Sequence, residues 1–135
     1  MKYNISNKVV LITGASRGIG KSISAELAAN GARIVLLSRN EVELKKINNQ
    51  FINSGFQSIY YPVDVSKLDD LNKAVEYVKS KWDTIDALVN NAGITEDNLI
   101  VRMKPESFER VINVNLKGVF NGIKSVSKTM IKNNY

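Results

Sequence analysis

Short apolar runs and segments of helical periodicity alternate along this chain, and the alternation constrains its fold more than any other feature. Runs rich in Val, Ile and Leu occupy 8–13, 33–38, 58–65 and 85–90, and one helical segment separates each run from the next. Such runs are typical of strands buried on both faces. Strands joined by single helices must lie parallel, with right-handed crossovers. The pattern predicts an α/β fold with a doubly wound parallel sheet of strand order 3-2-1-4.

Helical spacing predicts a first helix that ends at Asn30-Gly31, a second over 41–53, a third over 68–78 and a long helical stretch from Pro105 onward. The apolar residues of the last stretch are expected to keep one face: Leu116, Val119, Phe120, Ile123, Val126 and Met130. No linker or sequence repeat interrupts the pattern. We therefore expect 1–135 to form one partial domain, the N-terminal portion of a Rossmann-type fold.

The composition excludes several kinds of site. The 135 residues contain no Cys and no His, which rules out disulfides, thiol nucleophiles, Ser-His-Asp triads and ordinary structural zinc sites, and no metal site is expected. No stretch approaches the length of a membrane span and no signal peptide is recognisable, so we expect a cytoplasmic protein without membrane contact. The formal charge of +6 is scattered along predicted helices, and we expect no nucleic-acid partner.

A glycine-rich turn joins the first predicted strand to the first helix. Backbone N–H groups and the positive end of a helix can receive a pyrophosphate at such a place. A side chain at Gly14 would obstruct the tight turn, one at Gly18 would block the phosphates, and one at Gly20 would hold the helix off the sheet. The alternative is a tight turn without a ligand. The candidate cofactor-binding residues here are Gly14, Ala15, Ser16, Arg17, Gly18, Ile19 and Gly20.

The glycine spacing is GxxxGxG, and a second motif, Asn90-Asn91-Ala92-Gly93, closes the fourth predicted strand. With these two motifs at these places, the chain resembles the short-chain dehydrogenase/reductase family over essentially its whole length. The resemblance implies an oxidoreductase with a nicotinamide cofactor, and it implies that Asn91, Ala92 and Gly93 lie beside the adenosine half of that cofactor. It also implies a homo-oligomer, a dimer or a tetramer, for the complete protein.

The end of the second predicted strand bears on which cofactor binds. NAD-binding proteins of this architecture carry an acidic residue there that binds the ribose hydroxyls, whereas this chain has Ser38 and Arg39. A guanidinium and a hydroxyl can bind the 2′-phosphate of NADPH through charge-assisted hydrogen bonds, so NADPH is the expected cofactor. Alternatively, Arg39 is an exposed residue that pairs with Glu41 or Glu43.

Asp64 and Val65, at the end of the third predicted strand, match the adenine-contacting pair of the family that this chain resembles. Asp64 could equally cap the approach to the third helix through Ser66. Both interpretations can hold at once.

The segment 93–104 resembles a loop of bacterial-type 3-oxoacyl-acyl-carrier-protein reductases. That resemblance implies NADPH-dependent reduction of a 3-oxoacyl thioester in fatty acid synthesis, with a small-molecule or carrier-protein-linked acyl substrate. Six basic residues could attract an acidic acyl carrier protein or could form an ordinary solvated face: Arg102, Lys104, Lys117, Lys124, Lys128 and Lys132. The alternatives are another alcohol or ketone substrate, or a non-catalytic nucleotide-binding chain.

Asn115 is the candidate catalytic residue. Its position in the family belongs to a Ser-Tyr-Lys-Asn set that supports a proton relay through water, while the alternative is a polar residue facing solvent in a helix. The serine and the YxxxK of that set would follow a fifth strand, and no such segment is present. Tyr77 and Lys81 do spell YxxxK, but they precede the fourth strand and are rejected. We therefore expect this chain to be a fragment that is inactive alone.

Overall fold

The computed structural model describes residues 4–134, and its four strands form one parallel sheet in the order β3-β2-β1-β4. This confirms the predicted α/β fold and the strand order. Since β1 and β2 lie inside the sheet, their residues are almost all buried. The strands are β1 (Val9–Thr13), β2 (Arg33–Ser38), β3 (Ser58–Pro62) and β4 (Ala87–Val89).

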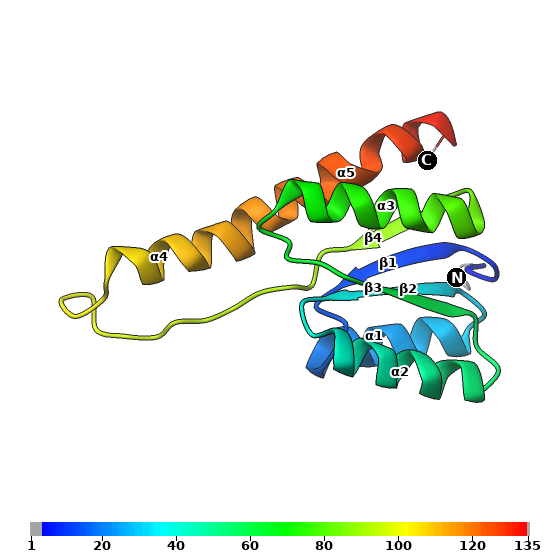
Figure 1. Ribbon diagram of the computed structural model, residues 1–135, viewed down its shortest axis with the longest axis horizontal. Helices are drawn as coiled ribbons and strands as arrows, with labels where there is room; N and C mark the ends of the chain where they lie inside the picture. Colours follow the sequence, from blue (N-terminus) through cyan, green and yellow to red (C-terminus); the bar gives the residue numbers. More distant parts are fainter. Residues whose placement is uncertain (1–3, 135) are drawn as a thin grey trace.

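Helices cover both faces of the sheet, with α1 and α2 on one face and α3 and α5 on the other (Figure 1). Each face has its own apolar core. Leu36 and Leu44 belong to the core under α1 and α2, and Leu11 and Val78 belong to the core under α3 and α5. The helices are α1 (Gly18–Ala29), α2 (Glu41–Asn53), α3 (Leu68–Trp82), α4 (Pro105–Ile112) and α5 (Gly118–Lys132).

Two strands are each three residues shorter than the sequence predicts, and β1 lacks only the first predicted residue. β3 ends at Pro62 instead of Val65, because the chain turns at Asp64, whose carboxylate accepts a hydrogen bond from the Ser66 N–H at 3.0 Å. β4 begins at Ala87 instead of Ile85, because the Val9 N–H donates to the Asp86 carboxylate at 2.8 Å rather than to a strand carbonyl. A side-chain acceptor therefore replaces a strand carbonyl at the start of β4, and a local turn follows the end of β3.

The long helical stretch is not one regular helix. A π-helical turn, η1 (Asn113–Lys117), lies between α4 and α5. Residues 94–117, which we call the arm, extend away from the sheet (Figure 1). Neither α4 nor η1 contains a buried residue. The arm is therefore connected to the rest of the molecule mainly through its two ends.

The apolar residues expected on one face of the last stretch are not all buried. Val126 is buried and Met130 packs against the core beneath α3 and α5. Leu116, Phe120 and Ile123, by contrast, are 65%, 59% and 53% exposed. The face that packs closely on the sheet is instead built around Gly118, Asn121 and Gly122. Helical spacing predicted a helix correctly but could not tell which of two adjacent faces meets the sheet.

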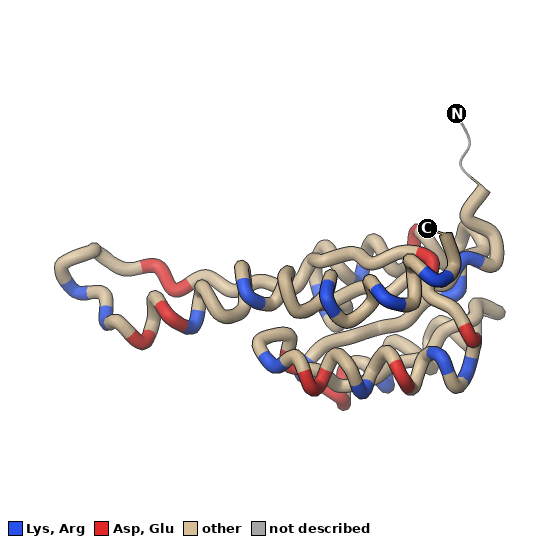
Figure 2. The backbone as a smooth tube through the Cα atoms, turned by 90° about the horizontal axis from the view of Figure 1, so that it is seen from above, with Lys and Arg blue, Asp and Glu red and all other residues tan. Residues whose placement is uncertain are grey.

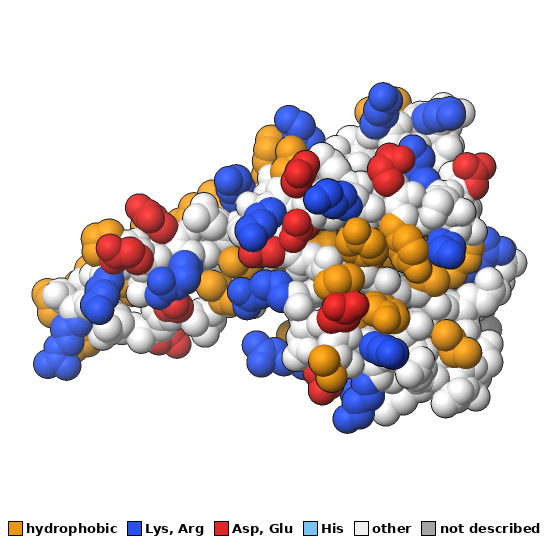
Figure 3. Space-filling view, in the orientation of Figure 1, with side chains coloured by type: hydrophobic (Ala, Val, Ile, Leu, Met, Phe, Trp, Pro, Cys, Tyr) orange, Lys and Arg blue, Asp and Glu red, His pale blue; other side chains and the backbone are white. Residues whose placement is uncertain are grey.

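Charged side chains of both signs are spread over the molecule. The tube in Figure 2 shows basic and acidic residues along most of the chain and only basic ones on α5, and Figure 3 shows both signs interspersed on the face viewed. Within residues 4–134, no helix has the length and apolar character needed to cross a lipid bilayer.

Candidate functional site

A cavity of about 730 Å³ lies at the carboxyl ends of the strands, where open parallel sheets of this kind bind ligands. It brings together residues from the glycine-rich turn, the end of β2, the segment after β3 and the segment after β4. Most of the predicted site residues line it: Gly14, Ser16, Arg17, Gly18, Ile19, Ser38, Arg39, Asp64, Val65, Asn91, Ala92 and Gly93.

Three predicted residues do not line this cavity. Ala15 is fully buried, and its N–H donates to the Leu37 carbonyl at 3.1 Å, so it anchors the turn to β2. Gly20 is buried in the first turn of α1. Asn115 lies in η1, at the base of the arm. The structure therefore gives these three residues supporting positions around the cavity.

The glycines of the turn meet different constraints. Gly14 and Gly18 have φ of +65° and +57°, a region that residues with a Cβ rarely adopt. A Cβ at Gly18 would meet nothing within 4 Å, so the space beside it is open to the cavity. A Cβ at Gly20 would lie 2.2 Å from the Gly14 carbonyl oxygen and 2.5 Å from Asn91 Nδ2. Gly20 thus allows the turn and Asn91 to approach the helix, rather than the helix to approach the sheet.

The N-terminus of α1 has no capping side chain. Arg17 occupies the N-cap without a side-chain hydrogen bond, and the first turn contains no acidic residue. The first backbone N–H groups of a helix have no partner inside the helix, and they carry the positive end of its dipole. Because Arg17, Gly18 and Ile19 also line the cavity, this end of α1 can receive an anionic group there.

Thr13 and Asn91 hold the glycine-rich turn against the segment after β4. The Thr13 hydroxyl accepts from the N–H groups of Asn91 and Ala92, each at 3.0 Å. The Asn91 side-chain amide donates to the carbonyls of Thr13 and Gly14, each at 3.2 Å. These four hydrogen bonds satisfy turn backbone and fix two walls of the cavity relative to each other. The sequence predicted Asn91 at the site but not the part played by Thr13.

The end of β2 presents an exposed guanidinium to the cavity. No ion pair joins Arg39 to Glu41, Glu43 or any other acidic residue among residues 4–134. The proposed pairing with these two glutamates is therefore absent. The Ser38 hydroxyl accepts from the Asn40 N–H at 3.2 Å, while Asn40 caps α2 through the Glu43 N–H. Hence Ser38 and Asn40 shape the loop, and the Arg39 side chain makes no ion pair within residues 4–134.

Asp64 is ionised more readily than an ordinary aspartate. Partial burial raises the pKa of its carboxyl, but the hydroxyl and N–H of Ser66 and the nearby charges of Arg39 and Lys67 together lower that pKa below its usual value. The hydroxyl of Ser66 lies 2.6 Å from the carboxylate. Asp64 caps the approach to α3 through Ser66, as the second interpretation of the sequence expected, while Lys67 is the N-cap residue of that helix. The carboxylate therefore stays charged at the cavity wall.

Both polar atoms of the Asn115 side chain bind the backbone of Ile94. The Ile94 N–H donates to Oδ1 and the Ile94 carbonyl accepts from Nδ2, each at 2.8 Å. Ile94 and Val114 both line the cavity. The side chain of Asn115 consequently holds the segment after Gly93 in place, and its contribution to a proton relay stays a prediction.

Some lining residues were not predicted from the sequence. Asn40 comes directly after Arg39, Glu43 lies in the first turn of α2, and Val63 comes directly before Asp64. The rule that ligands bind beyond the carboxyl ends of parallel strands would have included all three. Ile94 and Val114 meet only because η1 returns to the segment after β4, which no local pattern indicates.

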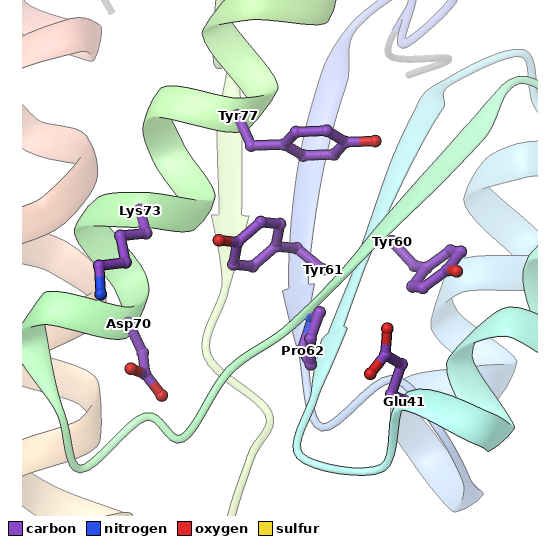
Figure 4. Close-up of a pocket in the computed structure, with 7 residues that line it drawn as sticks. All are labelled: Glu41, Tyr60, Tyr61, Pro62, Asp70, Lys73 and Tyr77. Atoms are coloured by element: carbon purple, nitrogen blue, oxygen red, sulfur yellow. The ribbon is translucent and has the colours of Figure 1, made fainter.

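The Tyr77 and Lys81 pair lies away from this cavity. Tyr77 lines a second hollow, of about 550 Å³, along the free edge of β3. Figure 4 shows Tyr61, Tyr77, Asp70 and Lys73 on the side of α3, with Tyr60 and Glu41 on the side of α2. The rings of Tyr61 and Tyr77 pack with centroids 5.3 Å apart. This YxxxK is thus part of the packing at the edge of the sheet.

Comparison with known proteins gives matches of the same architecture. The model of the short chain dehydrogenase family matches residues 8–135. The chain is 39% identical over 127 residues to the 3-oxoacyl-[acyl-carrier-protein] reductase FabG of Staphylococcus epidermidis, with 93% of this chain and 52% of that protein covered. It is 42% identical over 128 residues to the reductase of the same name from Thermotoga maritima, with 95% and 52% covered.

A solved structure agrees with the whole described fold. The gluconate 5-dehydrogenase of Burkholderia cenocepacia, in complex with NADP and tartrate, matches with a TM-score of 0.92 and 32% identity, and 98% of this chain and 52% of that chain are covered. The chain therefore spans about half the length of these relatives. Together with the cavity at the carboxyl edge and the two motifs that form its walls, these matches show that the chain belongs to the short-chain dehydrogenase family.

Proposed function

We propose that this chain binds NADPH at the carboxyl edge of its sheet, as the nucleotide-binding part of a reductase that acts on 3-oxoacyl thioesters. The observation that carries the proposal is the cavity in which the uncapped N-terminus of α1 and the unpaired guanidinium of Arg39 occur together. Its volume of about 730 Å³ lies in the range of small-molecule and cofactor sites. A dinucleotide phosphate carries negative charge at two separate places, and these two positive groups suit them.

The residues fit an NADP-type cofactor in a definite order. The open space beside Gly18 and the N–H groups of α1 would hold the pyrophosphate. Arg39 would bind the 2′-phosphate, since within residues 4–134 no carboxylate lies within ion-pair distance of its guanidinium. Asp64 and Val65 would contact the adenine, and Ala92 and Gly93 leave room for a flat ring. When bound, the reduced nicotinamide supplies hydride to a substrate carbonyl.

The charge at Arg39 gives the direct test of cofactor preference. Arg39→Asp places a carboxylate where the 2′-phosphate would lie, so NADPH affinity should fall by about one to two orders of magnitude while NADH affinity stays or rises. Arg102→Asp makes the same change of charge on the arm, outside the cavity, and is the matched control. Titration calorimetry of both nucleotides with the three proteins measures the effect. An unchanged NADPH to NADH ratio in Arg39→Asp would remove the assignment.

The substrate class rests on the relatives, two of which are 3-oxoacyl-[acyl-carrier-protein] reductases by name. The alternative is another alcohol or ketone, which the similarity to a gluconate 5-dehydrogenase favours. A non-catalytic nucleotide-binding chain is the other alternative, because the 135 residues hold no serine and YxxxK beyond a fifth strand. We expect this chain to bind NADPH, to oxidise none of it with a β-keto thioester or a simple ketone, and to reduce no NADP⁺ with gluconate. Turnover by this chain alone would show that other residues supply the proton.

An acidic acyl carrier protein is the partner we propose for the complete protein. Four lysines of η1 and α5 are exposed and could steer it by long-range attraction: Lys117, Lys124, Lys128 and Lys132. Replacing them with Gln should raise the KM for a carrier-linked substrate and leave a small thioester surrogate unaffected. If the wild type and the variant had the same KM for the carrier-linked substrate, these lysines would be ordinary solvent-exposed residues.

Homo-oligomerisation is the second proposed association. Phe108, Leu116, Phe120 and Ile123 are exposed apolar residues of α4, η1 and α5, and contiguous exposed apolar surface is typical of interfaces. Sedimentation velocity of the complete protein should show a dimer or a tetramer. A monomer whose mass is independent of concentration would contradict this association.

A further inference from the structure

Helix α5 reaches the cavity wall through one buried amide. Asn121 is 1% exposed and its Nδ2 donates to the Val65 carbonyl at 2.8 Å. Val65 is on the cavity wall, whereas Asn121 is not. On the basis of the proposed function, we infer that Asn121 is a positioning residue that sets adenine recognition at this site by holding the main chain of Val65. Its effect on the nucleotide passes entirely through Val65.

The packing of α5 supports this role. A Cβ at Gly118 would lie 2.7 Å from Val65 Cγ2 and 3.2 Å from Val65 Cβ. One turn later, a Cβ at Gly122 would lie 2.5 Å from Asn90 Oδ1, at the end of β4. The absence of side chains at Gly118 and Gly122 brings α5 close enough for the short Asn121 amide to reach the segment after β3. The contact is therefore built into the backbone spacing.

The segment around Val65 is held from three sides. The Asp64 N–H donates to the Asp70 carboxylate at 3.0 Å, and the Lys67 N–H donates to the Asp64 carbonyl at 3.0 Å. Asn121 supplies the third restraint, on the Val65 carbonyl. Within residues 4–134, the Val65 N–H has no acceptor. The restraints thus leave one fixed backbone donor next to one ionised carboxylate, that of Asp64.

A donor beside an acceptor matches one purine edge and opposes another. Adenine offers a ring-nitrogen acceptor beside an amino donor, so it can pair with the Val65 N–H and the Asp64 carboxylate. Hypoxanthine reverses the two, with a ring N–H beside a carbonyl oxygen. Buried polar groups left unpaired disfavour the wrong ligand strongly. The position of Val65 therefore governs the preference for adenine over hypoxanthine.

The experiment compares NADP⁺ with its hypoxanthine analogue by titration calorimetry on the full chain. The wild type should bind NADP⁺ about tenfold more tightly than the analogue. Asn121→Leu keeps the size and removes the donor, so the preference should fall to about twofold or less. Asn48→Leu is the matched control, because Asn48 is also a buried asparagine, bonded to Ser58 at 2.6 Å beneath the other face of the sheet. The control should lower the Tm and keep the adenine preference.

The outcomes separate the two proposals. A wild-type chain that binds neither dinucleotide would overturn the proposed function together with this inference. A wild type that prefers NADP⁺, with Asn121→Leu keeping that preference, would overturn the inference alone. An equal loss of preference in Asn48→Leu would also overturn it, because the effect would then follow from lost stability.

A measurement without substitution covers the case in which Asn121→Leu does not fold. The side-chain amide resonances of ¹⁵N-labelled wild-type Asn121 should shift when adenosine 2′,5′-bisphosphate is added, because Val65 would then bind the adenine. Pyrophosphate, which would occupy the glycine-rich turn only, should leave them in place. Unshifted Asn121 resonances at saturation with the adenosine compound would contradict the inference.

Discussion

The sheet with its covering helices and the arm are built in opposite ways from one chain. In the sheet, side chains such as Leu11 and Leu36 are fully enclosed, and two apolar cores lie between the strands and the helices. In the arm, α4 and η1 contain no fully buried residue, only Val114 of η1 packs partly against a core, and Ile100 and Val101 are more than four-fifths exposed. The arm is held instead by polar contacts: Arg110 donates to the Glu96 carboxylate at 2.8 and 2.9 Å, and Asn115 binds Ile94.

The difference teaches where stability and shape come from in this molecule. Apolar burial supplies most of the free energy of folding, so the sheet region carries the stability of the chain. Exposed ion pairs contribute little, about 0 to 1 kcal/mol each. The arm therefore takes its direction from a few hydrogen bonds at its base, and the cavity depends on the arm only through Ile94 and Val114.

Leu→Ala substitutions in the sheet and in the arm should differ most in their effect on the free energy of unfolding. Leu36→Ala removes a fully buried side chain and should lower the free energy of unfolding by about 3 kcal/mol. Leu116→Ala removes a side chain that is two-thirds exposed and should change it by less than about 0.5 kcal/mol. Urea denaturation followed by circular dichroism measures both. Equal losses would mean that the arm is part of the cooperative core.

The glycine-rich turn offers a sharper test within the sheet region. Gly20→Ala forces a Cβ against the Gly14 carbonyl and Asn91, so it should cost about 2 to 3 kcal/mol of stability. The Cβ added in Gly18→Ala would contact no atom. Its only cost is the left-handed φ of residue 18, which should lower the stability by about 1 kcal/mol. Thermal unfolding ranks the two variants. If Gly18→Ala were the less stable of the two, the close approach of the Gly14 carbonyl and Asn91 would not be what requires glycine at position 20.

The base of the arm should respond locally rather than globally. Asn115→Leu removes both hydrogen bonds to Ile94 and should lower overall stability by about 1 kcal/mol or less, because the site is exposed. Exchange of the Ile94 amide hydrogen should accelerate by about tenfold. Asn113→Leu, in the same π-helical turn, is the control and should leave that amide unchanged. Protection of Ile94 that survives Asn115→Leu would show that another contact holds the arm.

The smallest effect concerns acid stability near the cavity. The pKa of Asp64 is lowered in the folded chain, because hydrogen bonds from Ser66 and the charges of Arg39 and Lys67 outweigh its partial burial. A lowered folded pKa stabilises the native state above the unfolded value near 4, and that stabilisation is lost as the pH falls through the folded value. Asp64→Asn should therefore flatten the decline of Tm on acidification. An identical decline in both proteins would contradict the shift.

The sequence predicts the sheet region far better than the arm. Buried strands and helices have periodicities set by burial, so the bounds of β2 and α2 agree with those predicted. The shorter β4 depends on a contact between Asp86 and Val9, which are distant in sequence. The π-helical turn and the exposure of Leu116 depend on which face of a helix meets the sheet. Such long-range choices leave no local pattern.

The candidate site follows the same division. Motifs identified the glycine-rich turn, Arg39 and Asn91, because their types and spacing have a physical reason at a strand end. Asn121 carries no such signal, since most asparagines within a helical pattern face solvent. Its contact with Val65 joins residues that are 56 positions apart in the chain. Local patterns therefore miss the residues that support a site from behind.

Pro62, the last residue of β3, has a consequence for how the sheet can be extended. β3 pairs with β2 through the Gln57 carbonyl and the Val63 N–H, so the backbones of Ser58, Tyr60 and Pro62 alternate toward the open edge. A proline there offers no N–H to an incoming strand. Another chain that tried to add at this edge would lose a hydrogen bond beside bulky tyrosines. Strand addition, and with it edge-to-edge polymerisation, is disfavoured on the β3 side of the sheet.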